Sequence, residues 1–168
     1  MVIGNRQRTT GHRAGMTLIE VLIVVSIMGI AAAIVVPTMI QPGQLTIQAA
    51  SRLVISDILV AQNEAVAQAA PRRIKFDLAG NGYKLVDANH ATVALPWMKQ
   101  GYSVSFAKDS RFQGVKLELV DFGGNDYVQF DDLGGTTTGG TIELSAQGHR
   151  YRISVRPFTG RVTVAPVP

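Results

Sequence analysis

An uncharged and almost wholly aliphatic run near the N-terminus limits what this 168-residue chain can fold into more than any other feature does. The run extends from Val21 to Val36, and only Ser26 and Gly29 interrupt its apolar side chains. As an α-helix, the run would span roughly 24 Å, and the longer stretch 16–40 would span roughly 37 Å. Because the hydrocarbon core of a bilayer is about 30 Å thick, the longer stretch is predicted to cross a membrane.

The charged residues around this run predict its orientation. Of the 16 Lys and Arg residues, Arg6, Arg8 and Arg13 lie within the first fifteen residues, where none of the 12 acidic residues lies. The positive-inside rule therefore places the N-terminus in the cytoplasm and the rest of the chain outside. The high pI is partly a property of the first fifteen residues, so it does not indicate a nucleic-acid-binding domain. The absence of cysteine excludes a disulfide scaffold, a thiol nucleophile and a thiolate metal site.

Glu20 is an unusual residue at the start of a membrane helix, because an unpaired charge costs at least ~2.5 kcal/mol near the bilayer centre. No Lys or Arg lies between Gly15 and Arg52 to pair with it. Cleavage between Gly15 and Met16 would create a partner, namely the new α-amino group of Met16. A secretory signal would instead have small residues after the apolar run, where this chain has Pro-Thr-Met at 37–39.

These residues carry a resemblance to a known family. The segment Gly15-Met16-Thr17-Leu18-Ile19-Glu20-Val21, followed by an apolar helix with Gly29 and Pro37, resembles the type IV prepilin signature. That family includes pilins, type II secretion pseudopilins and competence pseudopilins, and Met16 stands where Phe is more common. The resemblance implies that a prepilin peptidase cuts after Gly15 and N-methylates Met16. It also implies that Glu20 neutralises the N-terminal amine of a neighbouring subunit during assembly, and that Pro37 kinks the helix.

The next segment has the pattern of an amphipathic helix. After Pro42-Gly43, which is expected to break or kink the first helix, residues 45–70 repeat apolar side chains at steps of three and four. This stripe, predicted to pack on a sheet, consists of Ile47, Ala50, Val54, Ile58, Ala61 and Ala65, whereas Arg52, Asp57, Gln62 and Glu64 fall mostly elsewhere. Pro71 is expected to end the helix.

After Pro71 the sequence consists of short β-type runs between turns. Nine strands are predicted, at 73–78, 83–87, 92–95, 102–106, 115–120, 127–130, 141–145, 151–155 and 161–164. Asn81-Gly82 and Gln147-Gly148 indicate tight hairpin turns, and the glycine-rich residues 134–140 indicate a flexible connection. The expected fold is therefore α+β, with a long N-terminal transmembrane and amphipathic helix packed on a C-terminal β-rich head of two antiparallel sheets.

A second resemblance covers roughly residues 45–165. The helix end Ala61–Val66 running into 73–76, and the closing segments 140–144, 152–155 and 159–162, are similar to the GspH/FimT family. With the prepilin signature, this divides the chain into a leader peptide (1–15), a transmembrane and filament-core helix (16–40), the amphipathic helix of the head (41–71) and the β-rich head (72–168).

The two resemblances together imply a minor pseudopilin, most like the H-type subunit of a type II secretion system. Such a subunit would be a single-pass inner-membrane protein with its head in the periplasm, and would enter a pseudopilus after processing. Its partners would be the prepilin peptidase, other pseudopilins or pilins, and secreted cargo, and it would need no cofactor. The alternative is a FimT-like type IV minor pilin that binds DNA for uptake or primes pilus assembly.

The sequence contains none of the common catalytic motifs that would indicate an enzyme. No GxSxG, HExxH, P-loop or GxGxxG motif occurs. His12 lies in the leader, and neither His90 nor His149 is at metal-ligand spacing from another possible ligand. Asp131-Asp132 beside Gly134 is predicted to be a solvated turn rather than a Ca²⁺ site. Trp97 is expected to anchor the core or a loop, or, if exposed, to be a contact hot spot. A signal-anchored enzyme would require a pocket that the sequence does not indicate.

Arginines cluster near the C-terminus. Because side chains alternate along a strand, Arg150, Arg152 and Arg156 are predicted to share one face, with Arg161 nearby. Tyr151, Ile153 and Val155 would face the core. The row could be a solvated surface, a contact for an acidic protein, or a phosphate or DNA contact. Some FimT-type minor pilins bind DNA for uptake through C-terminal basic residues of a Gly-Arg-x-Arg type, and the segment 160–163 lacks the second arginine.

Overall fold

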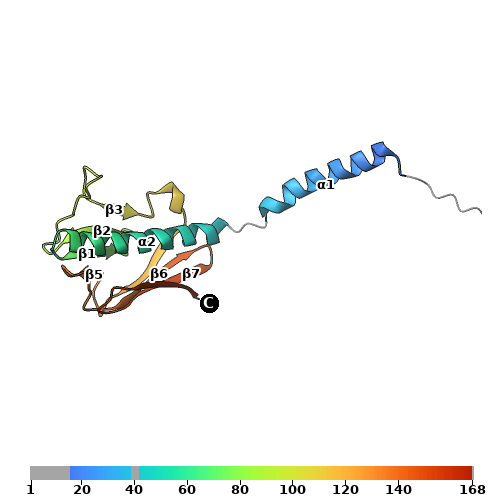
Figure 1. Ribbon diagram of the computed structural model, residues 1–168. Helices are drawn as coiled ribbons and strands as arrows, with labels where there is room; N and C mark the ends of the chain where they lie inside the picture. The colour runs from blue at the N-terminus through green and yellow to red at the C-terminus, as the bar shows by residue number, and fades with distance from the viewer. Residues whose placement is uncertain (1–15, 39–41, 168) are drawn as a thin grey trace, which may run out of the picture. The chain divides into compact units, whose positions relative to one another are not determined.

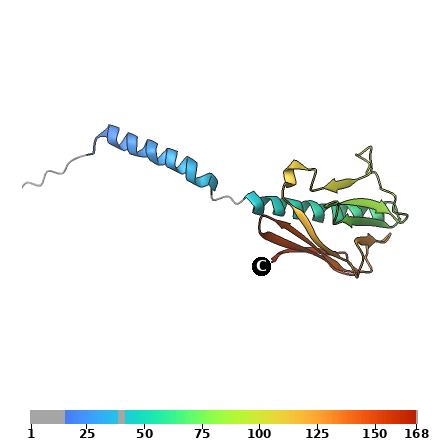
Figure 2. The ribbon, with the colours of Figure 1, turned by 180° about the vertical axis from the view of Figure 1, so that it is seen from behind.

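The computed structural model describes residues 16–38 and 42–167, which fall into two compact units. The first unit is the helix α1 (Leu18–Thr38), and the second is the head. Figure 1 and Figure 2 show the helices and strands of each unit from two sides. The predicted leader, including Gly15, lies outside the described residues.

Helix α1 starts at a defined cap. Thr17 precedes its first residue, and the Thr17 hydroxyl and carbonyl oxygens accept from the Glu20 N–H at 3.3 and 3.0 Å. This is the usual N-cap arrangement, with Glu20 in the first turn where the helix dipole favours a carboxylate. Within the described residues, no helix reaches the length and apolarity that a membrane span requires. The helix ends at Thr38, just after Pro37, whose side chain lies outside the described part, so the kink stays a prediction.

The head consists of helix α2 (Pro42–Ala67) and two four-stranded antiparallel sheets. The first sheet has the order β3-β2-β1-β5, with β1 (Arg72–Asp77), β2 (Gly82–Asp87), β3 (Ser103–Ser105) and β5 (Tyr127–Phe130). The second has the order β4-β6-β7-β8, with β4 (Lys116–Asp121), β6 (Gly140–Ala146), β7 (His149–Val155) and β8 (Val162–Val167). A short 3-10 helix, Ser110–Phe112, lies between β3 and β4. The α+β fold with two antiparallel sheets is thus confirmed.

Helix α2 packs on both sheets along its predicted apolar stripe. All six predicted residues of that stripe are buried: Ile47, Ala50, Val54, Ile58, Ala61 and Ala65. Figure 1 shows α2 running along the head, with β3 on one side and β6 and β7 on the other. The ring of Phe76 on β1 also stacks on that of Phe122, the residue directly after β4, with centroids 6.1 Å apart. Pro42 is the first residue of α2 rather than a break before it, which suits proline because the first helical N–H needs no partner.

One predicted strand is wrong. Residues 92–95 form no strand and make only isolated bridges, Val86 with Thr92 and Ala94 with Gly101. The chain turns at Pro96, which cannot donate to a ladder, and returns along itself before β3. Eight of the nine predicted strands are present in the described residues, with ends shifted by a few positions.

The two predicted hairpin turns have different outcomes. Gln147 and Gly148, with φ of 48° and 83°, form the expected two-residue turn, and Ala146 pairs with His149. The first turn is longer than predicted, because it spans residues 78–81 and Gly82 already pairs with Asp77. The Asn81 side chain explains the difference. It donates to the Val115 carbonyl and accepts from the Leu117 N–H, both at 2.8 Å, and so ties this turn to the second sheet.

Candidate functional site

The residues at the start of α1 are the first candidate site. Met16 is 70% exposed, and all described side chains from Met16 to residue 32 are exposed, including Glu20. The exposed side chains of consecutive positions are aliphatic, so they point in every direction around the helix. A helix that is apolar on all sides is stable only when lipid or other protein surrounds it. In such surroundings the Glu20 carboxylate needs a cation.

The arginine row of β7 has the predicted alternation. Ile153 and Val155 are buried and Tyr151 is half-buried, whereas the Arg150 and Arg152 side chains are 52% and 50% exposed. Arg156 and Arg161 continue the row just beyond the strands, where the Arg156 N–H donates to the Arg161 carbonyl at 2.9 Å. The structure therefore brings all four predicted arginines to the outer face of the second sheet.

Glu143 on β6 divides this row into two parts, and sequence reasoning missed it. It is directly opposite Arg152 in the β6–β7 register and is 8% exposed. The Arg152 guanidinium donates to one of its carboxylate oxygens at 2.8 and 2.6 Å, and Arg150 lies 3.9 Å from the other. Within the described residues, Arg156 and Arg161 have no carboxylate within ion-pair distance. Arg150 and Arg152 therefore share the single negative charge of Glu143, and Arg156 and Arg161 are left with uncompensated charge.

A buried carboxylate lies elsewhere in the head. Asp57 of α2 is 6% exposed, and the hydroxyls of Tyr83 and Tyr102 each donate to its Oδ2 at 2.6 Å. Burial raises the pKa of Asp57, and the two hydrogen bonds lower it without cancelling that effect. Burial beside the carboxylate also raises the pKa of both tyrosine hydroxyls. The cluster links α2 to the first sheet.

The remaining sequence candidates have structural roles. His90 lies 3.2 Å from the Arg73 guanidinium, which itself stacks over the Tyr127 ring at 5.0 Å. The Asp131 carboxylate accepts from the N–H groups of Leu133 and Gly135, as expected for a turn. Within residues 16–38 and 42–167, no group of three or more acidic or histidine side chains could hold a metal ion. Trp97 is 69% exposed, so it does not anchor the core.

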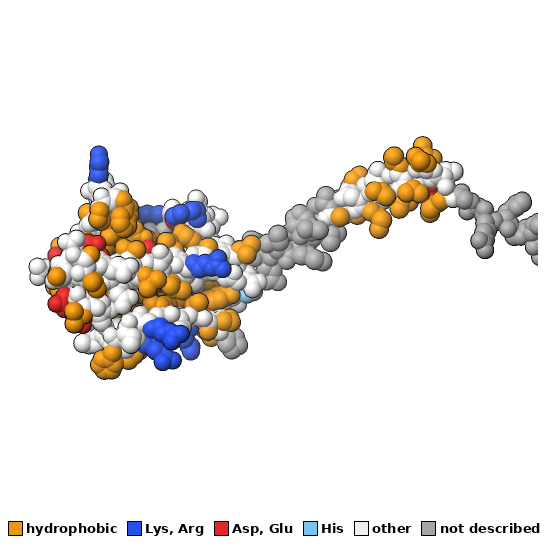
Figure 3. All heavy atoms as spheres, viewed as in Figure 1, with side chains coloured by type: hydrophobic (Ala, Val, Ile, Leu, Met, Phe, Trp, Pro, Cys, Tyr) orange, Lys and Arg blue, Asp and Glu red, His pale blue; other side chains and the backbone are white. Residues whose placement is uncertain are grey.

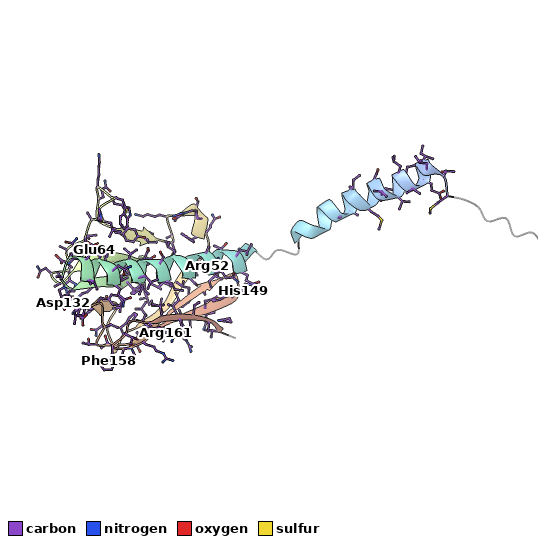
Figure 4. All side chains as sticks on the ribbon, viewed as in Figure 1. Arg52, Glu64, Asp132, His149, Phe158 and Arg161 are labelled. Carbon is purple, nitrogen blue, oxygen red and sulfur yellow. The ribbon has the colours of Figure 1, made fainter. Side chains whose placement is uncertain are left out.

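The predicted flexible connection at 134–140 is held to α2. The Gln62 amide donates to the Gly134 carbonyl at 2.6 Å, and Thr136 is 3% exposed. The same amide lies 3.4 Å from the Thr159 carbonyl, so it also reaches the turn before β8. Figure 4 shows side chains of this end of the head, among them Asp132, Phe158 and Arg161.

Comparisons with known proteins agree with these features. Residues 11–36 match the prokaryotic N-terminal methylation motif, and residues 50–160 match the family described as type II transport protein GspH. No curated protein sequence matches the chain significantly.

Two solved structures share the fold of the head. The minor pseudopilin EpsH from the type 2 secretion system of Vibrio cholerae is 12% identical, covers 71% of this chain and 95% of its own, and gives a TM-score of 0.51. The type IV minor pilin FimU of Pseudomonas aeruginosa is 16% identical, with coverages of 71% and 87% and a TM-score of 0.51. The head thus has a fold found both in a secretion pseudopilin and in a type IV minor pilin.

Proposed function

Because the chain belongs to the family of the type II transport protein GspH, we propose that it acts as a minor pseudopilin of a type II secretion system. The observation that carries this proposal is the joining, in one chain, of the N-terminal methylation motif to the GspH region. The role is structural rather than enzymatic: the subunit is processed, inserted into a short filament and held there by its N-terminal helix.

The proposed mechanism of assembly follows from the chemistry of α1. A prepilin peptidase cuts after Gly15 and methylates the new amine of Met16, which stays positively charged. The aliphatic side chains of α1 are covered first by the lipid of the inner membrane and then by the helices of neighbouring subunits. In that apolar surrounding Glu20 pairs with the N-terminal amine of a neighbour, so that neither charge is buried alone. The N-terminus lies in the cytoplasm before cleavage, and the head lies in the periplasm, where it contacts other minor subunits or cargo.

Substitution of Gly15 tests the processing step. We expect Gly15→Ala to slow cleavage at least about tenfold, because the added methyl group must fit where the peptidase accepts a residue without a side chain, and a loss of about 1.4 kcal/mol in the transition state has that effect. Co-expression with a prepilin peptidase, followed by mass spectrometry of the N-terminus over time, measures the rate. The matched control is Gly11→Ala, four residues earlier in the leader, which should be cut normally. Equal cleavage of the Gly15 variant and the wild-type chain would mean that the peptidase cuts elsewhere.

DNA binding by the arginine row distinguishes the proposed pseudopilin from the alternative, a DNA-uptake pilin. Because Arg150 and Arg152 share Glu143, we expect the full chain in detergent to bind duplex DNA only at low salt. This weak binding should fall only slightly in the Arg150/Arg152/Arg156 triple alanine variant, because Arg156 alone of the three has no carboxylate partner. Glu143→Gln is the matched control, since it keeps every arginine but removes the internal carboxylate and should strengthen binding. Tight binding that weakens steeply with salt and disappears in the triple variant would favour a DNA-uptake pilin.

A further inference from the structure

Strand β8 closes the second sheet and has an unpaired edge. It pairs with β7 on one side, and no other described strand pairs with its second side. The bond from the Arg156 N–H to the Arg161 carbonyl sets the direction of its backbone groups. Since these groups alternate along an antiparallel strand, Thr163, Ala165 and Val167 bond to β7. Val162, Val164 and Pro166 therefore direct their backbone groups to the free edge.

This free edge can accept another strand. It offers the N–H groups of Val162 and Val164 as donors and the carbonyls of Val162, Val164 and Pro166 as acceptors. Pro166 has no N–H, but its position costs β8 no bond to β7, because that N–H would also face the edge. Unpaired backbone groups along a strand of six residues are what an added strand requires.

The inner face beside the edge is apolar and uncovered. Val164 lies opposite the buried Ile153, yet it is 45% exposed, because α2 packs on β6 and β7 rather than on β8. The flank of α2 above it carries Leu59, 45% exposed, and the half-buried Ile55, one turn earlier. Gln48 lies on the same flank, and its amide donates to the Tyr151 hydroxyl of β7 at 3.1 Å. This side of α2 therefore faces β7 and the neighbouring β8.

Cations border this apolar band on both sides. Figure 4 places Arg52 on α2 and Arg161 before β8, and Figure 3 shows hydrophobic side chains between the two basic groups. Arg161 and Arg156 lie on the outer face of the sheet, and no carboxylate of the described chain is close enough to pair with them. A strand added at the edge would therefore meet apolar side chains with one face and guanidinium groups with the other.

We propose that the β8 edge binds an extended segment of a partner protein whose side chains alternate between apolar and acidic. The apolar set would pack on Val164 and Leu59, the acidic set would pair with Arg156 and Arg161, and the segment's backbone would bond to Val162 and Val164. This surface goes beyond the filament role proposed above, because neither the methylation motif nor α1 contributes to it.

The chemistry of the surface favours a polypeptide over two other occupants. Nucleic acid would pair with the arginines but would leave the apolar band and the edge amides without partners. A second copy of β8 could supply a strand, but β8 contains no acidic residue to meet the arginines. Only an acidic and apolar strand satisfies the edge, the band and the charges together.

The test uses the full chain in detergent micelles and a labelled synthetic peptide that alternates valine and glutamate over about eight residues. Fluorescence anisotropy should show binding that weakens with added salt. A peptide of the same composition in scrambled order should bind at least about tenfold more weakly, since it cannot sort its side chains between the two faces. On binding, the Val162 and Val164 amides should exchange their hydrogens more slowly.

Two protein variants locate the site. Val164→Pro removes one edge-facing N–H and should weaken binding about tenfold, whereas the matched control Val164→Ile keeps both the N–H and an apolar side chain and should bind like the wild-type chain. Arg161→Glu should weaken binding by at least as much, because it places a carboxylate against the acidic face of the peptide. Near-ultraviolet circular dichroism checks that each variant is folded.

Backbone-methylated peptides test, on the wild-type protein, whether the peptide binds through its backbone amides. This test does not depend on folding of the proline variant. Methylation of one alternate set of peptide amides should abolish binding, and methylation of the other set should not. Several results would overturn the proposal: equal binding by both methylated peptides or by the scrambled one, or no binding up to millimolar peptide. Self-association of the chain that is lost in the Val164→Pro variant would instead mean that the edge binds a second copy of the chain. DNA that displaces the peptide while remaining bound in the Val164 variant would assign the arginines to nucleic acid.

Discussion

A precursor with Glu20→Ala should still be cut after Gly15 but should be nearly absent from assembled filaments. In the mechanism proposed above, the peptidase acts on the cytoplasmic side before assembly, so the loss of the carboxylate should leave cleavage intact. During assembly the charged N-terminal amine would enter an apolar helix bundle without its partner. Removing one member of a buried ion pair costs about 3–5 kcal/mol, which lowers incorporation by on the order of a hundred-fold or more. Quantitative immunoblotting of sheared filaments and of the membrane fraction measures both quantities.

Two control variants separate charge from helix capping in this experiment. Glu20→Gln has nearly the same shape but no charge, so it should fail as Glu20→Ala does. Thr17→Ala removes the hydroxyl that accepts from the Glu20 N–H, and such a loss costs only about 1 kcal/mol. Normal incorporation of Glu20→Gln would mean that the carboxylate is not needed as a charge, and the proposed pairing would then be wrong.

The parts of the fold that were predicted correctly depend on local patterns. The apolar stripe of α2 and the alternation in β7 need only a few neighbouring residues, and both are confirmed. Strand β8 was predicted to end at Val164 but continues to Val167 through Pro166. Proline usually ends a strand, but this one lies where its missing N–H would face the free edge, which a sequence pattern does not reveal.

The Glu143–Arg152 pair could have been predicted from the sequence. A two-residue turn at Gln147-Gly148 fixes the register of the hairpin, and counting outward from Ala146 and His149 places Glu143 opposite Arg152. The burial of Asp57 and its two tyrosine partners could not have been predicted in this way. Asp57 falls outside the apolar stripe and looks like an exposed helix residue, and its partners come from elements 26 and 45 residues further along the chain. Only the packing of α2 on the first sheet brings these three side chains together.

Asp57→Ala should destabilise the head more than any other single change to a polar side chain considered for it. The substitution removes the acceptor of two hydroxyls, one of which belongs to Tyr83, a residue that is 3% exposed. A buried hydroxyl without an acceptor costs about 1–3 kcal/mol, and the lost side chain also leaves a small cavity. We therefore expect the free energy of unfolding to fall by about 2–4 kcal/mol. Urea unfolding of the full chain in detergent, followed by near-ultraviolet circular dichroism, measures it.

Tyrosine variants give this experiment a matched control. Tyr83→Phe and Tyr102→Phe each remove one donor to Asp57 and should each cost about 1–2 kcal/mol. Tyr127→Phe also removes a hydroxyl from the first sheet, but this tyrosine is half-exposed and contributes its ring rather than its hydroxyl to a contact with Arg73. Its unfolding free energy should change by less than about 0.5 kcal/mol. Equal effects of all three variants would mean that the Asp57 cluster contributes nothing specific.

The pH dependence of stability tests the state of the same carboxylate. Because burial raises the pKa of Asp57 above its usual 3.8, the folded head holds this proton more tightly than the unfolded chain does. The resulting stabilisation is complete below pH 3.8 and is lost as the pH rises through the folded-state pKa. Asp57→Asn keeps the shape of the side chain but cannot ionise. As the pH rises over this range, the free energy of unfolding of the wild type should therefore fall relative to that of the variant. The difference between the two curves isolates Asp57, since every other titrating group is common to both. A difference that stays constant from pH 3.8 to neutrality would show that burial does not disfavour the ionised carboxylate, and that the two tyrosine hydroxyls compensate its charge fully.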